Sequence, residues 1–173
     1  MSTPASIKDH PIHPMLVGIP IGLWVFSLVS DIIYAARWGG PVWADVAYYT
    51  MVGGVIGALI AAVPGFIDYL SISDAKTKST GTRHLIINLS VVALYIINII
   101  IRSNGQPNMA LPIILSVVAI GALLYSGWLG GDLVYEHGMA VELEPDGKLS
   151  KGRPRPYEVT AARERDERGR LTA

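Results

Sequence analysis

The chain contains no cysteine in its 173 residues. Without thiols it cannot form disulfides, ligate iron–sulfur clusters, build thiolate metal sites or use a cysteine nucleophile. Charged residues are also scarce, at 16% of the chain against roughly 25% in soluble domains, which argues against a water-soluble globule. The 14 basic and 14 acidic side chains cancel, so the chain has no overall positive field that would attract nucleic acid.

Hydrophobic residues make up 51% of the sequence and are concentrated in its first 141 residues. Four stretches approach the ~20 apolar residues that cross a ~30 Å hydrocarbon core. They are residues 15–36, 46–70, 85–101 and 111–133. This pattern predicts an all-α membrane protein, with an antiparallel four-transmembrane-helix bundle in residues 1–141. Residues 142–173 are predicted to form a charged tail, with a short hairpin around a Pro-Asp-Gly turn and a partly disordered remainder.

Basic residues mark one side of the predicted bundle. Four spans place both termini and the loop of residues 71–83 on the same side, which then holds twelve of the 14 basic residues. Arg37 and Arg102 lie on the other side. Because short cytoplasmic loops are enriched in Lys and Arg, both termini are expected in the cytoplasm. Four aromatic residues fit an interfacial belt on the opposite face: Trp38, Trp43, Tyr48 and Tyr49.

Each predicted span carries a stripe of polar or small residues at helical spacing. In the third span the stripe occupies an arc of about 80°. Such stripes should face the bundle interior, because unpaired polar groups in lipid are costly. For Asn98 and Tyr95, holding helices together is favoured over forming a conduction path. The four stripes are Pro20, Trp24, Ser27, Asp31 and Tyr34; Gly54, Ala58, Ala61, Gly65 and Asp68; His84, Asn88, Tyr95, Asn98 and Arg102; and Gly121, Tyr125, Trp128 and Asp132.

All four histidines fall at the predicted cytoplasmic ends of the spans. His10 and His13 precede the first span, His84 opens the third and His137 follows the fourth. Two aspartates, Asp68 and Asp132, lie at the same level. The arrangement suggests a duplicated hairpin that contributes one His and one Asp per copy, related by an axis along the membrane normal.

Several motifs resemble those of a known family. They are Asp9-His-Pro-Ile-His-Pro-Met-Leu-Val-Gly-Ile-Pro-Ile-Gly22, Pro64-Gly-Phe-Ile-Asp-Tyr69, Arg83-His84 with Asn88, and Ser126-Gly-Trp-Leu-Gly-Gly-Asp-Leu-Val-Tyr-Glu-His-Gly138. Over roughly residues 10–141 the chain resembles a functionally uncharacterised family of bacterial four-helix membrane domains, domain of unknown function 2231. The resemblance implies a multi-pass protein of the bacterial inner membrane. The family-motif residues present here are His10, His13, Asp68, His84, Asn88, Asp132 and His137.

Some relatives in that family are fused to a Rieske iron–sulfur domain, which implies a redox setting. This chain has no cysteine with which to build such a domain. An electron donor would therefore have to be a separate protein.

Three hypotheses follow from the histidines. The first is binding of b-type haem and electron transfer, with His13 and His84 as one ligand pair and with His10 and His137 as a second pair or as supporting groups. The second is a transition-metal or proton site in a small transporter or sensor, formed by His13, His84, Asp68 and Asp132. The third is a structural partner subunit without a cofactor. Asn88, Arg83 and Trp128 are expected to support the site.

Motifs of hydrolytic enzymes are absent from the sequence. It contains no Gly-x-Ser-x-Gly, no phosphate-binding loop and no His-Glu-x-x-His. The sequence therefore assigns no enzyme activity, and it leaves open whether copies of the chain assemble.

Overall fold

The computed structural model describes residues 3–8, 10–105 and 108–141. The predicted tail of residues 142–173, including its hairpin, lies outside the described residues. The elements in chain order are β1 (Ser6–Ile7), β2 (His10–Pro11), α1 (Ile12–Leu16), α2 (Gly18–Ala35), α3 (Val42–Leu70), α4 (Ala75–Ser103) and α5 (Ala110–Tyr135).

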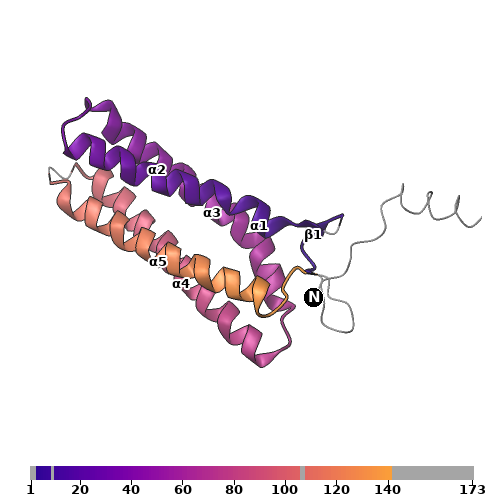
Figure 1. Cartoon of the computed structure of the whole chain (residues 1–173). Helices are drawn as coiled ribbons and strands as arrows, with labels where there is room; N and C mark the ends of the chain where they lie inside the picture. Colours follow the sequence, from indigo (N-terminus) through magenta and orange to yellow (C-terminus); the bar gives the residue numbers. More distant parts are fainter. Residues whose placement is uncertain (1–2, 9, 106–107, 142–173) are drawn as a thin grey trace, which may run out of the picture.

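The long helices form two antiparallel hairpins that pack into one bundle (Figure 1). α2 lies against α3 and α4 lies against α5, while contacts of α3 with α4 and of α2 with α5 close the ring. The helices α2 and α4 are therefore diagonal across the bundle axis. Four segments are long and apolar enough to cross a membrane, with α1 and α2 together forming one span of 24 residues. The predicted all-α four-helix membrane bundle is confirmed.

The third span begins earlier than its hydrophobicity indicates. Residues 71–83 were expected to form a loop, but α4 begins at Ala75, so that prediction was wrong. The Asp74 carboxylate accepts the backbone N–H and the hydroxyl of Thr77, both at 2.7 Å, and so caps the helix. Thr77 and Thr80 are buried in these first turns. These polar first turns extend the helix on the N-terminal side of the apolar stretch of residues 85–101. A count of apolar residues does not detect them.

The predicted inward stripes are correct for the first three spans and wrong for the fourth. Pro20, Trp24, Ser27 and Asp31 are buried on α2, as are Tyr95 and Asn98 on α4. On α5, however, Tyr125 is 54% exposed and Trp128 is 72% exposed. The aromatic rings face outward, as interfacial Trp and Tyr commonly do, and smaller residues face the bundle, where they permit close packing. The buried set of α5 is Pro112, Ser116, Ala119, Ser126 and Leu129.

The two hairpins carry the same pattern of buried positions. Pro20, Trp24 and Ser27 on α2 correspond to the buried residues Val91, Tyr95 and Asn98 on α4, each at an offset of 71 positions. All five buried residues of α5 lie 65 positions after buried residues of α3, which are Ala47, Met51, Gly54, Ala61 and Pro64. The duplication inferred from the sequence therefore extends along the whole bundle and relates its halves by an approximate two-fold axis parallel to the helices.

Candidate functional site

His13 and His84 face each other near one end of the bundle. His13 lies on α1 and His84 on α4, at equivalent positions of the two hairpins. Their ring centroids are 6.3 Å apart and the ring planes are nearly perpendicular, at 89°. Both side chains are partly buried. The two imidazoles therefore meet across the bundle axis.

The outer nitrogen of each ring is held by a backbone carbonyl. His13 Nδ1 lies 2.8 Å from the Ala61 carbonyl, and His84 Nδ1 lies 2.9 Å from the Ser126 carbonyl. Because a carbonyl only accepts hydrogen bonds, each Nδ1 carries the proton and donates it. In the neutral rings, each Nε2 then keeps a free lone pair, which is the arrangement used by histidines that bind metals.

A side-chain network positions His84 further. The Asn88 amide donates to the His84 carbonyl at 2.8 Å and to Ser126 Oγ at 2.7 Å, and that oxygen lies 3.0 Å from His84 Nδ1. Asn88, one of the residues predicted to support the site, is thus linked to His84 through Ser126. The corresponding residues around His13 are Ala61 and Val17, which cannot form this network, so the two halves differ at this point.

Two glycines allow the rings to approach the helices that hold them. A Cβ atom on Gly65 of α3 would lie 2.6 Å from His13 Nδ1, and one on Gly130 of α5 would lie 3.4 Å from His84 Cε1. These glycines are equivalent in the repeat, and each follows the hydrogen-bonding carbonyl residue by four positions. Gly65 in particular leaves the imidazole in direct contact with helix backbone.

The N-terminal segment is tied to α3 by Asp68. Its Oδ1 accepts the Ala5 N–H at 2.9 Å, and the Ala5 carbonyl accepts the Ile12 N–H at 3.0 Å. The short β1–β2 ladder pairs Ser6 with Pro11 within the same segment. Asp68 therefore contributes to the position of His13 by anchoring the segment before it, rather than by extending the imidazole pair.

The remaining predicted site residues lie apart from the imidazole pair. His10 is exposed, with Nδ1 2.8 Å from the Lys8 carbonyl, and His137 Nε2 lies 3.5 Å from Thr80 Oγ1. Arg83 is exposed and donates to Ser79 Oγ at 3.4 Å. Trp128 points away from the bundle, as described above.

The predicted metal set is not assembled. Among the described residues, no three His, Asp or Glu side chains lie close enough together to hold a metal ion. Asp68 corresponds in the repeat to Leu133, one residue after Asp132, so the aspartates of the two hairpins are on different helix faces. This difference of one position breaks the symmetric His/Asp arrangement inferred from the sequence.

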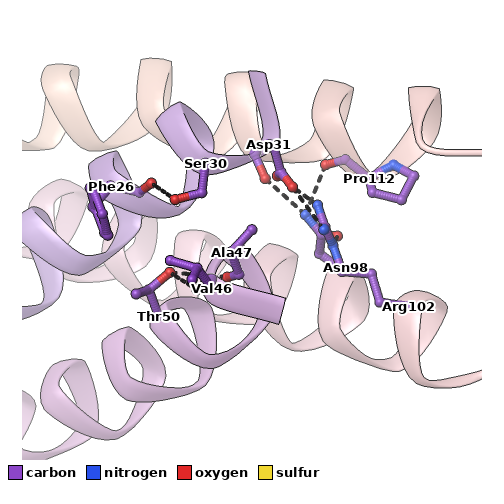
Figure 2. A network of polar contacts seen from close by, with 10 residues as sticks. Phe26, Ser30, Asp31, Val46, Ala47, Thr50, Asn98, Arg102 and Pro112 are labelled. Carbon is purple, nitrogen blue, oxygen red and sulfur yellow. Dashed lines mark hydrogen bonds and ion pairs between the residues drawn. The ribbon is translucent and has the colours of Figure 1, made fainter. Parts of the chain in front are cut away.

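A second polar cluster lies toward the other end of the bundle (Figure 2). Arg102 Nη1 and Nη2 donate to the two oxygens of Asp31 at 2.9 and 2.7 Å, and Arg102 Nε donates to Asn98 Oδ1 at 2.9 Å. The Asn98 amide donates in turn to the Pro112 carbonyl and to Ser116 Oγ, at 2.8 and 2.9 Å. The cluster joins α2, α4 and α5. The sequence placed Asp31, Asn98 and Arg102 on inward stripes but did not predict the ion pair. The signal for it was an acidic and a basic residue at similar depth in two of the predicted spans.

Trp24 and Tyr95 stack between the two polar regions. Their ring centroids are 4.5 Å apart, with an interplanar angle of 5°, and Trp24 Nε1 donates to the Met51 carbonyl at 3.4 Å. Both rings belong to the buried hydrophobic core. Along the bundle axis, three residues of the first hairpin thus contact their repeat equivalents in the second hairpin. The pairs are His13 with His84, Trp24 with Tyr95, and Asp31 with Arg102.

The match to a family model now identifies the chain. Residues 9–143 match the model described as predicted membrane protein, DUF2231. The chain belongs to the DUF2231 family. The match covers the four spans and all four histidines of this DUF2231 protein. No curated protein and no solved structure matches the chain.

Proposed function

We propose that this DUF2231 protein binds b-type haem and transfers electrons in the bacterial inner membrane, with His13 and His84 as the residues that would hold the haem iron. The observation that supports the proposal is the paired arrangement: two imidazoles meet across the bundle axis, and each donates Nδ1–H to a backbone carbonyl. A haem iron takes two axial imidazole nitrogens, and four-helix bundles hold such cofactors in their cores.

The number of donors favours haem over a bare metal ion. A structural zinc site takes four protein ligands and a catalytic one takes three, whereas the described residues bring two imidazoles together without a third His, Asp or Glu. A haem would bring the nitrogens of its own ring to the iron, so two imidazoles from the chain would suffice to hold it. When bound, it would supply a one-electron couple, and its redox partner would be a separate protein.

Each neighbouring group has a defined part in this proposal. Ala61 and Ser126 fix the proton on Nδ1, so that Nε2 is the ligating atom. Asn88 orients Ser126, and Gly65 and Gly130 let the rings lie close to the helix backbones. With both termini in the cytoplasm, as the basic residues indicate, the pair would lie near the cytoplasmic face and exchange electrons on that side.

An absorption spectrum of the detergent-purified protein tests the proposal. After expression in haem-replete cells, we expect a Soret band and reduced-state bands of bis-histidine haem. If the band is absent while metal analysis finds a stoichiometric transition metal, the metal hypothesis replaces this one. If neither is found, the account of the imidazoles as a cofactor site is wrong and the structural-subunit hypothesis replaces it.

A further inference from the structure

Two hydroxyl groups in the core have no hydrogen-bond partner among the described residues: Ser27 Oγ and the Tyr95 hydroxyl. Both side chains are fully buried. A buried donor without a partner loses its hydration and gains nothing in return, so native structures rarely leave one unsatisfied unless a water or ion completes it. Two such groups on facing helices indicate a ligand that is not part of the chain.

The Ser27 hydroxyl does not donate to the backbone carbonyl one helical turn earlier. A Ser or Thr in an apolar helix commonly donates to the carbonyl one turn earlier. Ser30 does so to Phe26 at 2.8 Å, and Thr50 does so to Val46 at 2.7 Å (Figure 2). The hydroxyl of Ser27 makes no such bond, and it therefore remains available to a partner inside the bundle.

Other buried side chains lie on the same side of α2 as the Ser27 hydroxyl. On α2, Trp24, Ser27 and Asp31 follow one another at spacings of three and four residues and share one face. Tyr95 stacks on Trp24, which places the Tyr95 ring beside the face of α2 that carries Ser27 and Asp31. Each Asp31 oxygen accepts one bond from Arg102, which leaves further lone pairs unused.

We propose that these groups bind an internal water molecule between α2 and α4. The water would accept from the hydroxyls of Tyr95 and Ser27 and donate to the Asp31 carboxylate, which gives it three polar partners, within the two to four that buried waters need. The site would link the aromatic stack to the Asp31–Arg102 ion pair and would provide an exchangeable proton inside the bundle. It does not depend on any cofactor at the imidazole pair.

Infrared spectroscopy of the protein in lipid, with H₂¹⁸O exchanged for H₂¹⁶O, tests this site. We expect an isotope-sensitive band of a strongly hydrogen-bonded water that disappears in Tyr95→Phe and in Ser27→Ala. Matched controls are Tyr125→Phe and Ser90→Ala, because Tyr125 faces outward and Ser90 is exposed and donates to the Ile86 carbonyl. The band should persist in both controls. Persistence of the band in Tyr95→Phe and Ser27→Ala, or its absence from the unmodified protein, would overturn the proposal.

Unfolding of the same variants gives an independent readout. If one water joins the hydroxyls, both single variants lower the unfolding midpoint, and the double variant loses less than the sum of the two. If the hydroxyls are truly unsatisfied, removing the Tyr95 oxygen relieves a buried polar group and raises the midpoint. A higher midpoint for Tyr95→Phe, or strictly additive losses, would contradict the shared water.

Discussion

At the scale of single residues, backbone contacts at small residues determine where the imidazoles lie. The ring of His13 packs on the backbone at Gly65, and its Nδ1 reaches the Ala61 carbonyl one helical turn earlier. A methyl group at Gly65 would need the space that the imidazole fills. Gly65 therefore fixes the position of His13 together with the hydrogen bond to Ala61.

Gly65→Ala should displace His13 from the Ala61 carbonyl, because the new Cβ would lie 2.6 Å from Nδ1. Accommodating such overpacking typically costs about 1–3 kcal/mol. Thermal unfolding in detergent should show this loss, and any haem spectrum should change with it. Gly127→Ala is the matched control, since a Cβ there meets nothing within 4 Å. Equal behaviour of the two variants would show that close packing at Gly65 is unimportant.

At the scale of helices, the start of α4 shows what hydrophobicity does and does not predict. The apolar stretches gave four spans in the correct order, and polar stripes gave the inward faces of three of them. The beginning of α4 instead depends on a local signal, the side chain of Asp74 beside Thr77. Such a cap can be recognised in the sequence only when the polar segments between the apolar stretches are also searched for helix-capping residues.

The cap predicts a pH dependence. The pKa of Asp74 lies below its ordinary value, chiefly because its carboxylate accepts the Thr77 N–H and then the Thr77 hydroxyl. The charged cap thus stabilises the fold above an unfolded-state pKa of about 3.9, and this contribution is lost as pH falls through the lower folded-state value. Asp74→Ala should lower the unfolding midpoint at neutral pH, and the difference from the unmodified protein should shrink below about pH 4.

Ser73→Ala is the control for the cap, because Ser73 is its exposed neighbour. It should change the midpoint little at any pH. A loss in Asp74→Ala that stays constant from neutral pH to below about pH 3 would contradict the assigned role of the carboxylate.

At the scale of the whole molecule, the repeat places matching residues of the two hairpins opposite each other along the axis. At one end the pair is Asp31 and Arg102, whose side chains are 0% and 7% exposed. Removing one partner leaves the other as an uncompensated buried charge, whereas replacing both with apolar residues often has little net effect. The ion pair should therefore stabilise a specific pairing of hairpins more than it adds net stability.

Arg102→Met should destabilise the bundle by about 3–5 kcal/mol, measured by reversible unfolding in detergent or bicelles. The double variant Asp31→Leu, Arg102→Met should recover most of that loss. Arg83→Met, at an exposed position of the same helix, should have little effect. A double variant as unstable as the single one would show that the charges are needed for stability itself.

Much of this arrangement could be predicted from the sequence, and the errors have physical causes. The helical period placed His84, Asn88 and Asn98 on one face, and repeated motifs indicated the duplication. The outward orientation of Trp128 was missed because aromatic rings suit both a bundle core and a lipid interface. Grouping Asp132 with Asp68 failed because one residue of helix turns a side chain by about 100°, and similarity of motifs does not fix that register.

We propose that His13 and His84 together hold haem, and titration of haem into the purified apoprotein is the sharpest test of this pairing. The full chain and three variants, His13→Ala, His84→Ala and His10→Ala, would be compared by absorption in detergent. We predict one haem per chain with a six-coordinate low-spin spectrum for the unmodified protein and for His10→Ala. That spectrum should be lost in His13→Ala and in His84→Ala. The absence of stoichiometric binding, or the same spectrum from all four proteins, would contradict the account.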